Sequence, residues 1–136
     1  MVDALRRAHR FVATDGSVVD LHPTDAPASV DVGGSTVGSV DAGDAVARHA
    51  RAGAALQSVV DEGLFDVETV IDFDFHTYGD TVEELRDYIA ENWRDARIDD
   101  RTMARARAAV VGAAHGVTPR VLERVRLTVL RPRKTP

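Results

Sequence analysis

The chain has 136 residues, of which 44% are hydrophobic and 29% charged, and its formal net charge is −5. This size and composition are those of one globular domain, residues 1–136, and they exclude collagen-like, low-complexity and strongly charged disordered chains. The sequence contains no cysteine, which excludes disulfides, thiolate metal sites and thiol catalysis.

No apolar run approaches the ~18 residues that cross a bilayer, and the first arginines are not followed by the apolar stretch of a signal peptide. We therefore expect a cytoplasmic protein with no membrane partner. Arginine supplies all but one of the 17 basic residues. Together with abundant alanine, valine and aspartate, this bias indicates a prokaryote with GC-rich genes.

Charge is distributed unevenly along the chain. Residues 101–136 carry eight arginines, Lys134 and one carboxylate, whereas the first hundred residues are acidic. A basic nucleic-acid surface is one interpretation of this segment. The other is that the segment packs beside acidic elements. We favour the second and expect no nucleic-acid partner, because the chain is acidic overall and no aromatic side chains alternate with these arginines.

The first third of the chain predicts a helix, a strand and a hairpin. Residues 2–12 have an amphipathic helical pattern, Asp15-Gly16 supplies a turn, and residues 18–23 form a strand that stops at a proline. Gly33-Gly34 between two alternating stretches predicts a β-hairpin, because both central residues of a type I′ turn need positive φ. A phosphate-binding loop is disfavoured, since no lysine follows and the GxGxxG spacing is missing.

The middle of the chain predicts a helix followed by a long strand. Residues 41–63 carry a shallow apolar stripe, with Asp44 placed to cap its start and Gly63 to end it. Gly53 lies on this stripe, where it lowers helix propensity by about 1 kcal/mol relative to alanine. We therefore expect Gly53 to allow close packing against a sheet. Residues 64–80 alternate as a strand with Ile71, Phe73 and Phe75 on one face.

The last part of the chain predicts two helices and a strand. Thr81 to Glu84 form a capping box, and the helix after it carries an apolar stripe of Val82, Leu85, Ile89 and Trp93. A second helix begins at Asp99 or Asp100, and residues 121–131 alternate as the last strand. The whole pattern predicts an α+β or truncated α/β domain, with a mixed, largely antiparallel sheet of about five strands and helices packed on it.

Two of these segments resemble the C-terminal half of class I S-adenosylmethionine-dependent methyltransferases. Residues 2–23 are similar to the family's fourth-helix-to-fifth-strand segment, and residues 73–98 to the region after a later strand in one small-molecule methyltransferase-like group. The resemblance implies a last strand that returns antiparallel between two others. The family's glycine-rich loop and ribose-binding acid have no counterpart in this sequence. We therefore expect no cofactor and no methyltransferase activity from this chain alone.

The resemblance implies a methyltransferase-related domain without its cofactor site, non-catalytic and acting through self-association or a partner. The edge of the strand at residues 18–23 favours a homodimer, although the Gly33-Gly34 hairpin offers another cover for that edge. Two further functions stay open. One is the substrate-side half of a two-chain methyltransferase, completed by a separately encoded half. The other is a small-molecule binding module with a pocket between the sheet and the helix at residues 82–93.

Candidate ligand-binding residues are His22, Asp20 and Tyr78. His22 ends the first strand, with Asp20 and Asp25 beside it, and ligands in open α/β sheets lie beyond the carboxyl ends of strands. Histidine also serves as an acid or base near neutral pH. The competing interpretation is a histidine that caps a loop. The histidines at positions 9, 49 and 115 have no paired spacing, and we interpret them as surface or capping residues.

Asp72, Asp74 and His76 alternate on one strand face, where three oxygen and nitrogen donors suit a divalent metal. Arg124 and Arg126 show matching alternation on the last strand. Opposite charges across neighbouring strands stabilise by about 0.2–1 kcal/mol. We favour ion pairs of Asp72 and Asp74 with the two arginines, and expect no metal.

Overall fold

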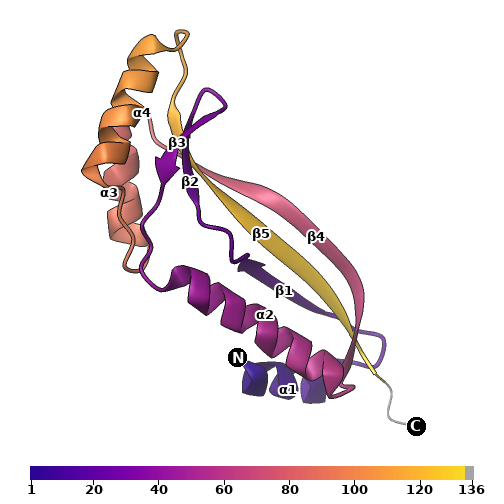
Figure 1. Ribbon diagram of the computed structural model, residues 1–136. Helices are drawn as coiled ribbons and strands as arrows, with labels where there is room; N and C mark the ends of the chain where they lie inside the picture. The colour runs from indigo at the N-terminus through magenta and orange to yellow at the C-terminus, as the bar shows by residue number, and fades with distance from the viewer. Residues whose placement is uncertain (134–136) are drawn as a thin grey trace. The chain divides into compact units, whose positions relative to one another are not determined.

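The computed structural model describes residues 1–133, so Lys134 of the basic C-terminal segment lies outside it. The helices are α1 (Val2–Phe11), α2 (Ala45–Asp61), α3 (Val82–Asn92) and α4 (Asp100–Gly112). The strands are β1 (Val18–Pro23), β2 (Ser29–Val32), β3 (Ser35–Ser39), β4 (Phe65–Tyr78) and β5 (Pro119–Pro132) (Figure 1). They form one open antiparallel sheet, in which β5 pairs with β1, β2 and β4, and β2 pairs with β3. The predicted α+β class, with helices packed on a five-stranded sheet, is confirmed.

Residue contacts divide the chain into two compact units, each of which is described by itself. Unit 1 contains Met1–Asp25, Ala47–Phe73 and the segment that begins at Val125. Unit 2 contains Ala26–Val46 and Asp74–Arg124. The long strands β4 and β5 therefore contribute residues to both units. In the part of the chain that the structure describes, no helix is long and apolar enough to cross a membrane.

Unit 1 is built around a small apolar core beneath its two helices. The core joins α1, α2, β4 and β5 through the buried side chains of Leu5, Leu56, Val59, Phe65 and Leu130. The two helices are also tied by an ion pair, in which Arg6 donates to Glu62 at 2.7 Å and 3.0 Å. Burial of apolar area is the main stabilising contribution here, because exposed ion pairs add about 0–1 kcal/mol at most.

Strand β1 has the bounds that the sequence predicts and pairs antiparallel with β5 from Val18↔Leu130 to Pro23↔Val125. Arg131 of β5 donates to the carbonyl oxygens of Asp15 and Gly16, at 2.9 Å and 3.3 Å. These bonds hold the turn between α1 and β1 against β5. The turn and strand are thus fixed by both backbone pairing and one arginine side chain.

The hairpin of unit 2 has the predicted turn. Gly33 and Gly34 have φ of 60° and 85°, and they connect Val32 with its partner Ser35, as a two-residue type I′ turn requires. Strand β2 also pairs with β5, with Val30 opposite Val121. Within residues 1–133 the register partners of β2 are on β3 and β5, and the hairpin has no register pair with β1.

The helices of unit 2 begin at the predicted caps. The Thr81 hydroxyl accepts from the Glu84 amide at 3.1 Å, and the Glu84 carboxylate accepts from the Asp80 amide at 3.1 Å. Asp99 caps α4 by accepting from the Thr102 amide at 2.7 Å. Both helices then pack onto the sheet through buried side chains that include Leu85, Ile89, Met103, Ala106 and Val121.

Glu123 of β5 is expected to cost stability at neutral pH. Burial raises the pKa of this carboxyl group, so the folded state holds its proton to a higher pH than the unfolded state does. The protonated carboxyl group therefore favours the folded state below its unfolded-state pKa, and this contribution to stability is lost as the pH rises through its folded-state pKa. Glu123→Gln should therefore raise Tm at about pH 7 and lose this advantage near pH 4. Thermal melts at both pH values test this.

The matched control is Glu91→Gln, since Glu91 is an exposed glutamate on α3. We expect it to change Tm little at either pH. If Glu123→Gln raised Tm by the same amount at both pH values, the explanation by burial of a charged carboxylate would be contradicted.

Candidate functional site

Strand β1 ends in a histidine–carboxylate pair. Asp20 and His22 lie on the same face of the strand because side chains alternate along it. Nδ1 of His22 is 2.5 Å from Oδ2 of Asp20, and the two side chains are only 14% and 12% exposed. In the neutral imidazole, Nδ1–H donates to this carboxylate, which fixes the ring and leaves Nε2 as a hydrogen-bond acceptor.

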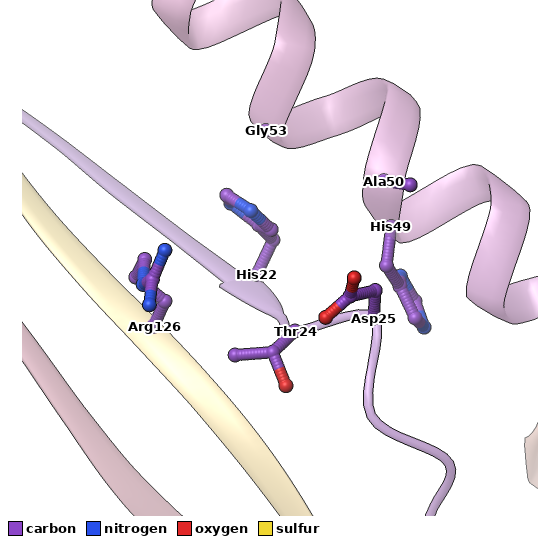
Figure 2. Close-up of a pocket in the computed structure, with 7 residues that line it drawn as sticks. All are labelled: His22, Thr24, Asp25, His49, Ala50, Gly53 and Arg126. Carbon is purple, nitrogen blue, oxygen red and sulfur yellow. The ribbon is translucent and has the colours of Figure 1, made fainter.

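A cavity of about 250 Å³ lies beside this pair. It is lined by His22, Thr24, Asp25, His49, Ala50, Gly53 and Arg126, all of them residues of unit 1. Figure 2 shows these side chains between β1, the segment after it, β5 and α2. A Cβ atom built on Gly53 would lie 3.9 Å from Nε2 of His22. The acceptor nitrogen therefore faces the one position on this helix face that has no side chain.

The expectation that Gly53 allows close packing of the helix against the sheet is wrong. Its built Cβ has no neighbour nearer than the Nε2 atom at 3.9 Å, which is ordinary van der Waals contact. Glycine is therefore not required for the approach of the helix here, and this position instead forms part of the wall of the cavity beside His22. The close backbone approach occurs at Gly38 of β3, where a Cβ would lie 2.4 Å from Oγ1 of Thr102.

Gly53→Ala is therefore expected to stabilise the protein by about 1 kcal/mol, because alanine is the better helix former and meets no clash here. Urea denaturation followed by circular dichroism measures this change. Gly38→Ala is the matched control and should destabilise, since the new methyl group overlaps Thr102. A loss of stability in Gly53→Ala would show that space above His22 is not free.

A second cavity of about 160 Å³ shares His22, Gly53 and Arg126 with the first. Its other walls are Leu56 and Gln57 of α2, Val67 and Val70 of β4, and Thr128 of β5. The first cavity thus has polar and apolar wall surface in nearly equal parts, and the second adds aliphatic side chains. We call the two together the His22 groove.

Arg126 lines the groove and also forms an ion pair with Asp72. It lies directly across from His22 in the β1–β5 register, and its Nε and Nη2 atoms donate to the two Asp72 oxygens at 2.8 Å and 2.9 Å. This bond to Asp72 raises the pKa of Arg126. In unit 2, Arg124 donates to Asp74 at 3.0 Å. Asp72 and Asp74 of β4 therefore each pair with an arginine. Residues 1–133 contain no cluster of three or more potential metal ligands.

His49 belongs to the groove, although the sequence pattern places it on the surface. Burial, followed by the positive charge of the neighbouring Arg48, lowers the pKa of His49. The imidazole is therefore neutral at neutral pH and still has a nitrogen that accepts hydrogen bonds. With Asp25 and Nε2 of His22, it supplies acceptors to the polar end of the groove, beside the Arg126 guanidinium.

Tyr78, the third candidate ligand-binding residue, is not part of the His22 groove. It ends β4 within unit 2, and its hydroxyl is 3.1 Å from Nδ1 of His76. Tyr78 lines neither of the two cavities. The helix at residues 82–93 contributes no residue to either cavity, and α2 supplies the helical wall of both.

A second feature of unit 1 is an exposed apolar sheet face, which we call the open face. Val19 and Leu21 of β1 lie opposite Val129 and Leu127 of β5. Alternation along β4 places Ile71 and Phe73 on the side opposite Asp72 and therefore on the same face. The exposed fractions of Val19, Leu21, Ile71 and Phe73 are 58%, 58%, 51% and 36%. The sequence pattern placed Ile71 and Phe73 on one face, and the resemblance implied a last strand between two others, but the sequence did not group Leu21 with these side chains.

Comparisons with known proteins add no family assignment. No protein-family model, no curated protein and no solved structure matches this chain. A functional assignment therefore has to be argued from the geometry of the His22 groove and the open face.

Proposed function

We propose that this chain is a methyltransferase-related domain without a cofactor site in these residues, and that it is non-catalytic and acts by associating with a second copy of itself. The observation that carries the association is the open face of unit 1. Its six apolar side chains come from three adjacent strands, and four of them are more than a third exposed. Contiguous apolar patches of this kind mark interaction surfaces more often than isolated exposed side chains do.

The surroundings of the open face resemble the rim of an interface. Continuing the alternation of β5, Arg131 and Arg133 lie on the same face as Val129, where they pair with Glu68 and Asp66 at 3.0 Å and 2.7 Å. An apolar centre with paired charges at its border is the usual arrangement in protein interfaces. The charges at this border are already neutralised within the chain.

A second copy suits the open face because the six central side chains carry no charge. Two such faces related by a twofold axis bring apolar groups against apolar groups and no like charges together. Two sheets packed face to face lie about 10 Å apart with interdigitated side chains. Both copies would then bury the same patch.

The strand order of unit 1 supports the methyltransferase relationship. The resemblance implies a last strand that lies antiparallel between two others, and β5 lies between β1 and β4. Helix α2 precedes β4, as the helix before the family's sixth strand does. These features are structural, and the non-catalytic role follows from the missing cofactor elements.

Sedimentation equilibrium over a range of concentrations tests the association. We expect a particle of twice the 14.7 kDa chain mass at tens of micromolar, dissociating on dilution. A monomer at every concentration up to about 200 µM would contradict the proposal, since specific interfaces bury at least about 1,000 Å² and persist well below that concentration.

The chain alone is expected to show no thermal stabilisation by S-adenosylmethionine. A ligand that binds only the folded state stabilises it by about 2.7 kcal/mol at a hundredfold excess over Kd. Differential scanning fluorimetry with millimolar cofactor measures this directly. A clear rise in Tm, confirmed by calorimetry, would show that these residues do hold the cofactor, and would contradict the non-catalytic role while leaving the association untouched.

A further inference from the structure

We propose that the His22 groove binds a small amphipathic molecule whose hydroxyl group donates a hydrogen bond to Nε2 of His22 and whose apolar body lies against α2 and β4. This site is separate from the open face, so it does not depend on the association proposed above. The inference is based on the chemistry of the groove walls and on the open space at Gly53.

The polar end of the groove favours a hydrogen-bond donor over an anion. Asp20 fixes His22 so that Nε2 accepts, and the Asp25 carboxylate lines the same cavity. The cation of this wall, Arg126, already holds Asp72 with two hydrogen bonds. A carboxylate or phosphate ligand would therefore meet the Asp25 carboxylate and an arginine that is already hydrogen-bonded, whereas a hydroxyl group finds acceptors.

The other end of the groove suits an apolar body. Leu56 of α2 and Val67 and Val70 of β4 supply aliphatic walls around about 160 Å³. In another protein a dry cavity of about 150 Å³ holds benzene, so a single ring with one hydroxyl group has the right size. Val67 and Val70 are 43% and 51% exposed, which leaves a wall for a ligand to cover.

Gly53 is what opens the groove above the ring. With no side chain at this position, the nearest atom to a built Cβ is Nε2 of His22 at 3.9 Å. A larger residue would occupy the space where the hydroxyl group must lie. Asp20 acts as a positioning residue, because it sets the tautomer and orientation of His22.

The test uses phenol as the probe and toluene as its isostere without a hydrogen-bond donor. Binding to the full chain is measured by NMR titration, with the ring proton between the two His22 nitrogens as the local signal. We expect phenol to shift this signal saturably at millimolar concentration. In His22→Leu, the Kd for phenol should rise about five- to tenfold, while that for toluene changes less than about twofold.

Two further variants separate binding from folding. Gly53→Leu fills the groove, and should abolish binding of both probes while keeping the native spectrum. His115→Leu, at an exposed histidine in the segment after α4, should change neither Kd. If His22→Leu fails to fold, the Gly53→Leu result and the local His22 signal in the wild type decide the question.

Absence of phenol binding to the wild type at about 10 mM would overturn the proposal. So would phenol binding that is unchanged in His22→Leu, or that persists in a folded Gly53→Leu variant. If His22→Leu weakened the affinity for phenol and for toluene equally, the histidine would shape the groove but receive no hydrogen bond from the ligand. That result would also overturn the proposal.

Discussion

Phe65→Ala is expected to destabilise the protein by about 3–5 kcal/mol, the usual cost of deleting a fully buried aromatic ring. Phe65 begins β4 and is completely buried in the core of unit 1. Its ring also meets His9 of α1 edge-on, with centroids 5.1 Å apart. Because so few buried side chains form this core, none can move in to fill the space left by the ring. The loss is measured as a shift in the urea midpoint followed by circular dichroism.

The matched control is Phe11→Ala at the end of α1, within the same unit. Phe11 is 81% exposed, so its removal should change the unfolding free energy by no more than about 0.5 kcal/mol. Equal effects of the two substitutions would show that the core of unit 1 contributes little to stability, contrary to the burial of Phe65.

The elements that the sequence predicted correctly are those fixed by neighbouring residues. The Gly33-Gly34 turn follows from the positive φ that only glycine adopts freely. The start of α3 follows from the bond between the Thr81 hydroxyl and the Glu84 amide. The proline stop at Pro23 likewise gave the end of β1. Each of these depends on the chemistry of a few consecutive residues.

The parts that the sequence did not predict depend on pairs that are distant along the chain. Asp20 and His22 could be grouped, because they are two residues apart on one strand. His49 could not, because its place in the groove depends on how α2 lies over β1. The space at Gly53 depends on the same contact, so helix propensity alone suggested close packing where the structure leaves an opening.

The open face likewise combines a local pattern that the sequence predicts with pairing between distant strands that it does not. Alternation on β4 predicts that Ile71 and Phe73 share a side, but not whether a helix covers it. Leu127 and Val129 join them only because β5 pairs with both β1 and β4. Pairing between strands that are more than fifty residues apart leaves no local signal. The charged partners on the last strand were predictable because Arg124 and Arg126 repeat the spacing of Asp72 and Asp74.

Leu21→Lys/Ile71→Lys is expected to weaken self-association at least about 100-fold. Both positions lie in the open face, on strands that pair only with β5 in the described chain. Lysine is well tolerated on exposed edge strands, and both side chains are more than half exposed. The folding stability of the monomer should therefore change by no more than about 1 kcal/mol. In a twofold dimer, however, the substitutions bring four ammonium groups into one apolar interface.

Burying a charge without a partner costs several kcal/mol, and every 1.4 kcal/mol changes Kd about tenfold. Sedimentation equilibrium of the double variant should accordingly give the monomer mass at concentrations where the wild type is dimeric. Val111→Lys on α4, at an apolar side chain that is 87% exposed, adds the same charge away from the open face and should leave the dimer intact. A dimer that survives in the double variant but dissociates in Val111→Lys would place the interface on unit 2, and the open face would then need another explanation.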